Sequence, residues 1–199
     1  PIMELIVSII GVPCVGKGAL IKAVQDKMLD EEPVGVVTTS DIVKHLLTDD
    51  DKKAMAGGGL FPRETELRET LYHTINDVFA FGASTVLLDG FPRFDDQLRW
   101  LRQMFYDRNI QIVQVLATSD FEIARRAGLR NRDEFDSPIH VAQRVATQRA
   151  LLGPIEQMIS MYGIPYTSVI NDDLDRARDE LIGRIKWPSK QPKLKKERR

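Results

Sequence analysis

A loop near the N-terminus combines two glycines with a lysine at a spacing suited to holding phosphate: Gly11-Val12-Pro13-Cys14-Val15-Gly16-Lys17. A turn bounded by glycines aims several backbone N–H groups at one point, and a helix behind it adds the positive end of its dipole. Lys17 brings a full positive charge to the same place. The pattern GxxxxGK therefore predicts a phosphate-binding loop, although Gly18 stands where Ser or Thr is usual. An ordinary turn before a core helix is the alternative.

A second segment places an aspartate at the end of an apolar run and an arginine four residues later: Leu87-Leu88-Asp89-Gly90-Phe91-Pro92-Arg93. Proteins with a phosphate loop put a metal-linked carboxylate at such a strand end, and Asp89 suits that role. The guanidinium of Arg93 can grip a phosphate with two N–H groups. A strand end followed by a turn, with Asp89 capping the next helix, would explain the aspartate, glycine and proline. It would not explain the arginine.

Short apolar and β-branched runs predict five buried strands, at residues 5–10, 34–38, 85–88, 110–116 and 165–170. Helical patterns begin near Gly16, Pro62, Phe94, Asp120, Pro138 and Asp173. Apolar strands that alternate with amphipathic helices predict an α/β fold with a parallel sheet covered on both faces. Ligands bind such folds beyond the C-terminal ends of the strands. The phosphate loop, Thr39 and Asp89 all follow strands in this way.

Three segments lie outside this alternation. Residues of about 40–80 form a long excursion, with Gly57-Gly58-Gly59 as an expected hinge or turn, and residues 127–137 are short and polar. Both fall on the side where a ligand binds, so either is a candidate lid. Residues 187–199 carry six Lys or Arg against one Glu, which predicts a disordered basic tail, with an RNA- or acid-binding arm as the alternative.

The composition favours one soluble domain, over residues 1–186. The 199 residues are 43% hydrophobic and 29% charged, as in ordinary globular proteins. A net charge of −1 gives no overall field that would draw the chain to nucleic acid or an anionic membrane. A single cysteine excludes an internal disulfide, and no apolar run approaches the roughly 20 residues that span a bilayer. We therefore expect a cytoplasmic monomer.

Two motifs in register, Gly-x-Pro-x-x-Gly-Lys-Gly and Asp-Gly-Phe-Pro-Arg-x-x-x-Gln, make the sequence resemble the nucleoside monophosphate kinase family, adenylate kinase above all. The resemblance covers most of residues 4–186. It implies a P-loop NTPase-type three-layer sandwich with a five-stranded parallel sheet, a helical monophosphate-binding insertion at about 40–80 and a short lid at about 127–137. It also implies phosphoryl transfer from ATP to a nucleoside monophosphate with Mg²⁺, and no zinc, since the lid has no room for a zinc site.

The resemblance also assigns roles to individual residues. ATP binding falls to the loop residues Gly11, Val12, Pro13, Cys14, Val15, Gly16, Lys17, Gly18 and Ala19. The monophosphate falls to Thr39, Lys44, Gly59, Leu60, Phe61, Gly90, Arg93 and Gln97, with Thr39 and Gln97 near the base. Asp89 would hold Mg²⁺ through water. The expected catalytic cations are Lys17, Arg93, Arg126, Arg130, Arg132 and Arg144, with Asp133 and Glu134 completing the lid motif. A solvated helix face with local ion pairs is the alternative for the arginines.

The sequence departs from the family pattern at four positions. Cys14 and Ser40 replace glycines, Ala19 replaces a threonine, and Lys44 replaces an arginine on the acceptor phosphate. These changes leave two other functions open: a degenerate, kinase-like nucleotide-binding regulatory protein, and a P-loop kinase that acts on a non-nucleotide phosphorylated acceptor or a nucleic-acid end. Among nucleotides, Thr39 favours AMP, while CMP, UMP, GMP and deoxynucleotides remain open.

Overall fold

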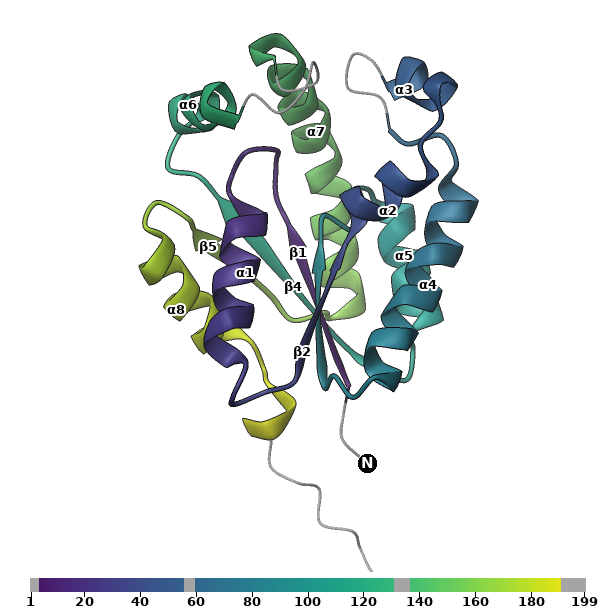
Figure 1. The fold of residues 1–199 in the computed structure, drawn as a ribbon, viewed down its shortest axis with the longest axis vertical. Coiled ribbons are helices and arrows are strands. Elements are labelled where there is room, and N and C mark those ends of the chain that lie inside the picture. The colour runs from purple at the N-terminus through teal and green to yellow at the C-terminus, as the bar shows by residue number, and fades with distance from the viewer. Residues whose placement is uncertain (1–3, 56–59, 131–136, 191–199) are drawn as a thin grey trace, which may run out of the picture.

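The computed structural model describes residues 4–55, 60–130 and 137–190. Five strands form one parallel sheet: β1 (Leu5–Ile10), β2 (Val34–Thr38), β3 (Thr85–Asp89), β4 (Asn109–Leu116) and β5 (Tyr166–Ile170). Their order across the sheet is β2-β3-β1-β4-β5. All six residues of the central strand β1 are buried, which accounts for its apolar run. The predicted α/β fold class is confirmed (Figure 1).

Helices cover both faces of the sheet and divide the core into two clusters. On one face α1 (Lys17–Met28) packs beside α8 (Leu174–Arg184), over alternate residues of β1 such as Val7 and Ile9. On the other face lie α4 (Glu64–Ala80), α5 (Asp95–Met104) and the C-terminal part of α7 (Pro138–Tyr162), over Ile6 and Ile10. Since side chains alternate along a strand, a strand that is apolar on both faces, apart from the buried Ser8, supplies both clusters.

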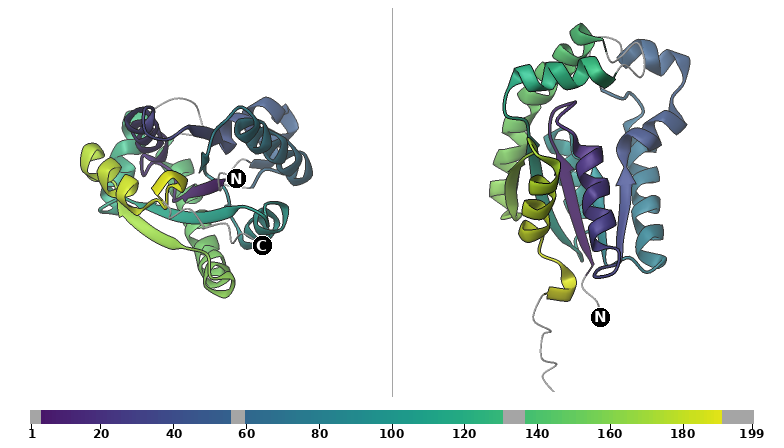
Figure 2. Two further views of the ribbon diagram at one scale, coloured as in Figure 1. Left: turned by 90° about the horizontal axis from the view of Figure 1, so that it is seen from below. Right: turned by 60° about the vertical axis from the view of Figure 1, so that its left-hand side comes forward.

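Three further helices lie beyond the C-terminal edge of the sheet: α2 (Thr39–Leu46), α3 (Asp49–Met55) and α6 (Asp120–Arg130). Figures 1 and 2 show them, with the start of α7, around the turn that joins β1 to α1. Helices α2, α3 and α4 make up the excursion between β2 and β3, while α6 and α7 flank the expected lid. The sheet edge that parallel α/β folds use for ligands is therefore surrounded by helices.

The predicted strands and helix starts lie within two residues of those in the structure, but the helical patterns did not include α2 and α3. The expected start of the tail at residue 187 is wrong. Trp187 is 1% exposed, packs into the same core cluster as α1 and α8, and its indole N–H donates to Ile182 O at 2.9 Å. A short 3₁₀ helix, η2 (Pro188–Lys190), follows it. One large aromatic side chain anchors a segment whose average composition is polar.

Several expectations concern parts of the chain that lie outside the described residues. They are the glycine hinge at residues 57–59, Arg132 with Asp133 and Glu134, and the tail from residue 191 onward.

Candidate nucleotide-binding and phosphoryl-transfer site

The predicted phosphate loop forms the turn between β1 and α1, and its two bounding glycines are required by its shape. A Cβ atom on Gly11 would lie 2.5 Å from Val115 O, and one on Gly16 would lie 2.4 Å from Asn171 Nδ2. Gly16 also has a φ of 86°, in the left-handed region that favours glycine. The loop therefore brings its backbone close to two neighbouring segments, as a backbone-built anion cradle needs.

Lys17 opens helix α1, and its ammonium group turns back over the loop. The Nζ atom donates to Gly11 O at 2.9 Å and to Val12 O at 3.1 Å. These bonds hold the positive charge beside the loop and the N-terminus of α1, where partial positive charge already gathers. A phosphate held by the loop N–H groups lies within reach of this cation.

Cys14 keeps the left-handed conformation that a glycine would adopt more easily. Its φ is 64°, and it is the one residue other than glycine with a positive φ in the described ranges. The side chain is buried against the core cluster of α1. A left-handed conformation costs a residue with a Cβ on the order of 1–2 kcal/mol. Cys14 therefore holds this position of the loop in a conformation that a glycine would adopt at lower cost.

Asn171, directly after β5, supports the loop from behind. Its buried side chain donates through Nδ2 to Val15 O at 2.9 Å and to Gly16 O at 3.4 Å. The sequence analysis missed this residue. Its signal was a polar side chain immediately after a strand, at the edge where the other site residues gather.

Arg126, expected among the catalytic arginines, joins helix α6 to the same loop. Its Nη1 donates to Val15 O at 3.0 Å and its Nη2 to Asn171 O at 2.6 Å. Its Nε donates to Glu122 Oε1 at 2.6 Å, and Arg125 and Arg126 lower the pKa of Glu122 to about 2. The donor side of the site is thus held by a network that spans three elements.

Asp89 lies at the end of β3, beside the start of α1. The strand register pairs it with Ile9 of β1, and its Oδ2 lies 3.9 Å from the position of a Cβ on Gly18. Mg²⁺ in nucleotide sites takes one or two carboxylates, with phosphate oxygens and water as its other ligands. Asp89 fits such a site. Within residues 4–55, 60–130 and 137–190, no cluster of three or more His, Cys, Asp or Glu side chains could hold a metal by itself.

Arg93 and Arg144 bring two positive charges together at the centre of the site. Burial lowers the pKa of Arg93, the positive charge of Arg144 lowers it further, and the carboxylates of Asp89 and Glu64 act in the opposite direction. The Nε of Arg93 donates to Gly90 O at 3.3 Å, and Gln148 of α7 donates to Arg93 O at 3.1 Å. Two guanidinium groups held together in a half-buried place favour an anion between them.

A small pocket beside Arg93 collects most of the residues expected to bind the monophosphate. Its lining residues are Thr39, Val43, Leu60, Phe61, Glu64, Leu67, Arg93, Phe94 and Gln97. Its volume is about 10 Å³, close to the space of one water molecule. Thr39 is 1% exposed, and its Oγ1 finds no hydrogen-bond partner in the described part of the chain. We call this cavity the acceptor pocket.

The remaining expected residues fall in different places. Lys44 is not brought to the acceptor pocket, because its side chain is 71% exposed and pairs with Asp41 at 3.4 Å on the surface of α2. Gly90 forms the turn before Arg93, with a φ of 78°. Arg130 ends helix α6, but its side chain lies outside the described part of the structure, as does Gly59.

Glu64 is a pocket residue that the sequence analysis missed. It opens helix α4, and its carboxylate accepts from Gln97 Nε2 and from Arg68 Nε, the latter at 2.7 Å. A glutamate in the first turn of a helix is common because of the helix dipole alone, so its position in the sequence did not point to a site.

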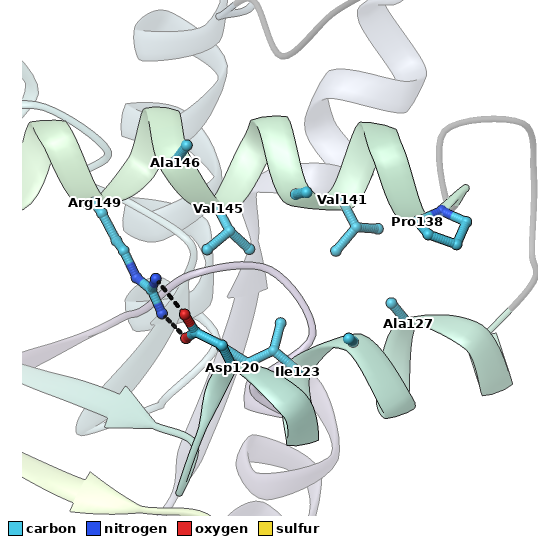
Figure 3. A pocket seen from close by; sticks show the side chains of 10 residues that line it. Asp120, Ile123, Ala127, Pro138, Val141, Val145, Ala146 and Arg149 are labelled. Atoms are coloured by element: carbon cyan, nitrogen blue, oxygen red, sulfur yellow. Dashed lines mark hydrogen bonds and ion pairs between the residues drawn. The ribbon is translucent and has the colours of Figure 1, made fainter.

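A larger cavity of about 220 Å³ lies between α6 and α7. Figure 3 shows apolar side chains such as Ile123, Val141 and Val145 facing one another across it. At one end Arg149 and Asp120 form a two-bond ion pair, with Arg149 Nη1 3.0 Å from Asp120 Oδ2. No residue that lines this cavity belongs to the loop or to the acceptor pocket, so we do not include the cavity in the candidate phosphate-binding site.

The parallel sheet and the glycine-bounded loop with its lysine define the class as a nucleotide-binding, kinase-like P-loop protein. A family described as an AAA domain matches residues 10–142, which is more than half of the chain. The chain belongs to this family, a P-loop NTPase family of kinase-like type. No curated protein matches the sequence. None of the helices in the described ranges has the length and apolar character that crossing a bilayer requires.

Proposed function

We propose that the protein transfers a phosphoryl group from ATP to a nucleoside monophosphate, with AMP as the first expected acceptor. The observation that carries the proposal is the acceptor pocket, which gathers Thr39, Leu60, Phe61, Arg93 and Gln97 at the sheet edge that also carries the phosphate loop. A loop alone would support ATP binding by many kinds of enzyme. A second pocket that shares Arg93 with the centre of the site supports a second phosphorylated substrate.

Positioning and charge neutralisation account for most of the catalysis in such a transfer. The loop N–H groups and Lys17 hold the β- and γ-phosphates of ATP. Arg93 and Arg144 hold the acceptor phosphate and neutralise the charge on the phosphoryl group in the transition state of the transfer. Asp89 would hold Mg²⁺ together with ATP, and the ion would supply positive charge to the donor phosphates. The acceptor phosphate is already ionised at neutral pH, so no general base is needed.

The lid arginines Arg130 and Arg132 complete the charge around the transferring group, while Arg126 acts by holding the loop through Val15 O. The small volume of the acceptor pocket means that its walls separate before a base enters, since a nucleobase is several times larger than one water molecule. Lys44 lies on α2, one of the elements that forms the wall, so a shift of α2 is the movement that brings Lys44 to the acceptor phosphate. Closure around both substrates also excludes water from the transfer.

Product formation tests the proposal directly. Full-length protein, ATP and Mg²⁺ are mixed with each ribo- and deoxynucleoside monophosphate in turn, and the products are separated by chromatography. We expect a diphosphate from at least one acceptor, and its formation should depend on Lys17. Lys17→Ala removes the loop cation, while Lys22→Ala in the same helix removes an exposed lysine that pairs only with Asp26 in the described structure. Conversion by Lys17→Ala at the wild-type rate would contradict the proposal.

The strained Cys14 and the surface position of Lys44 favour a second candidate, a nucleotide-binding regulatory protein without useful turnover. It predicts ATP binding with no diphosphate product from any monophosphate. A non-nucleotide phosphorylated acceptor would give a third pattern, in which ATP is consumed only when that acceptor is added. Calorimetry with ATP and a non-hydrolysable ATP analogue separates binding from turnover in all three cases.

A further inference from the structure

The side-chain amide of Gln97 is held at both of its ends inside the acceptor pocket. Its Oε1 accepts the backbone N–H of Arg93 at 2.7 Å, and its Nε2 donates to Glu64 Oε1 at 2.9 Å and Oε2 at 3.2 Å. A backbone N–H can only donate and a carboxylate can only accept, so these partners decide which end of the amide is oxygen. The buried amide therefore has one orientation.

Glu64 is itself held in place from outside the pocket. Arg68 Nε donates to Glu64 Oε1 at 2.7 Å, and Arg68 Nη2 donates to Asp96 Oδ2 at 2.8 Å. The guanidinium of Arg68 also lies over the ring of Trp100, 6.0 Å from its centre. Asp96 and Trp100 thus hold Arg68 in place, and Arg68 in turn holds the carboxylate of Glu64. The chain of contacts runs from the surface of α5 to the amide in the pocket.

A fixed amide distinguishes base edges that a rotating amide would accept equally. The edge of a 6-aminopurine offers an N6–H donor beside an N1 acceptor, whereas a 6-oxopurine offers an O6 acceptor beside an N1–H donor. A primary amide pairs with either edge, but it must turn over to change from one to the other. When the amide cannot turn, one of the two bases leaves buried polar groups unpaired, and that loss is costly.

We propose that Glu64 is a positioning residue that sets the base selectivity of the acceptor site by locking the amide of Gln97. The inference rests on the proposed function, in which this pocket receives the acceptor base. The ligand class that it defines is a purine monophosphate selected by the group at position 6. Glu64 does not react with the substrate; it acts through Gln97. The Thr39 hydroxyl, which has no partner among the described residues, offers the base a separate contact.

Binding of AMP and of IMP tests this role, because the two nucleotides differ at the 6-position edge alone. Calorimetry with the full chain and a non-hydrolysable ATP analogue gives the ratio of the two dissociation constants. In the wild type we expect a ratio of about tenfold or more, the size of one or two lost hydrogen bonds. Glu64→Gln replaces the carboxylate by a group that can accept or donate, and the ratio should fall at least about fivefold toward one.

Asp96→Asn is the matched control. It weakens the outer contact of Arg68 and leaves both partners of the Gln97 amide in place, so the ratio should stay at the wild-type value. If the melting temperature shows that Glu64→Gln does not fold, Arg68→Lys serves as the second variant. It removes the Nε bond to Glu64 without changing the pocket lining, and it should lower the ratio in the same direction.

The outcomes separate this inference from the function on which it rests. An unchanged ratio in Glu64→Gln, or equal weakening of both nucleotides, makes Glu64 merely structural and overturns the inference alone. Equal affinity of the wild type for AMP and IMP also overturns it. A wild type that binds neither nucleotide overturns the proposed acceptor, and the inference with it. A preference for either base that collapses in Glu64→Gln and persists in Asp96→Asn supports the lock.

Discussion

The phosphate loop and the acceptor pocket lie at the same edge of the sheet, yet they are prepared for a ligand to different degrees. The loop is held by Asn171 and Arg126, which bond to its backbone oxygens, and Lys17 already lies over it. The acceptor pocket has room for about one water molecule and contains the hydroxyl of Thr39 with no partner among the described residues. The loop is held in shape by its own contacts, whereas the acceptor pocket would have to widen before a nucleobase could enter it.

The proposed function accounts for this difference. A triphosphate is recognised by N–H groups whose geometry must exist before binding, because a backbone turn cannot be rebuilt at low cost. A base is recognised by side chains that can move apart and return. The donor side should therefore respond to mutation in stability and ATP affinity together, and the acceptor side in substrate affinity alone.

The largest expected effect comes from Arg93, where the two regions meet. Arg93→Ala should lower turnover about 100- to 1000-fold, as loss of one preorganised charge donor does. ATP affinity should change little, because the loop supplies it. The melting temperature should change little, since relief of the repulsion with Arg144 opposes the loss of the attraction to Asp89 and Glu64. Steady-state kinetics and thermal unfolding check these points.

Arg99→Ala is the control for that variant, because Arg99 is a half-exposed arginine on the next helix that pairs with Asp96. It should keep wild-type turnover. A similar loss of turnover in both variants would mean that general charge, and not the position of Arg93, matters.

Asn171→Ala should weaken the donor side in both respects. Val15 O keeps the bond from Arg126 and Gly16 O keeps the bond from Leu20 N, so no carbonyl is left unpaired, and loss of the Asn171 bonds should lower the free energy of unfolding by about 0.5–1.5 kcal/mol. The dissociation constant for ATP should rise about tenfold, because the loop loses its support. Denaturant unfolding and calorimetry measure the two effects. Asn76→Ala, which removes one bond to Tyr72 O on distant α4, should leave ATP affinity unchanged.

Thr39→Val should separate stability from binding on the acceptor side. The buried hydroxyl has no partner among the described residues, so replacing it by a methyl group should leave unfolding unchanged or raise its free energy by up to about 1 kcal/mol. The acceptor should bind about 5- to 30-fold more weakly, since its bond to the hydroxyl is lost. Thr39→Ser should retain most of the affinity. A drop in stability without a change in affinity would show that the hydroxyl serves the fold.

Cys14→Gly is expected to have the smallest effect. Relief of the left-handed conformation, less the entropy that glycine gains in the unfolded chain, should raise the free energy of unfolding by about 0.5–1 kcal/mol. Cys14→Ala keeps the strain and should give no such gain. Equal stability of the two variants in denaturant unfolding would show that the turn carries no strain at this position.

Much of the fold could be predicted from local sequence patterns. The runs at residues 5–10 and 34–38 match β1 and β2 at both ends. A short apolar run bounded by turn residues is typical of a buried strand in an α/β fold. Trp187 shows where the approach fails. A basic and proline-containing neighbourhood predicted disorder from residue 187, while the indole of Trp187 is buried in the core cluster that α1 and α8 share, and η2 follows it.

The candidate site was predictable wherever a residue's role follows from its own type and spacing. The loop with Lys17, and Asp89 with Arg93, belong to this class. Asn171 and Glu64 do not, because each acts through a contact with a residue far away in the chain: Asn171 with Val15, and Glu64 with Gln97. Lys44 is the opposite case, since its spacing suggested the phosphate and its side chain pairs instead with Asp41 on the surface.

The sequence by itself determined the order of the five strands and the main helices along the chain, the phosphate loop and the edge of the sheet where the site forms. Those features depend on periodicity and on short motifs, which act within a few residues of the chain. The tertiary structure alone decided which side chains meet: Asn171 behind the loop, Arg93 beside Arg144, and the fixed amide of Gln97 between Arg93 N and Glu64. Such contacts join residues that lie far apart in the chain, more than a hundred positions apart for Asn171 and Val15, so only the packed fold brings them together.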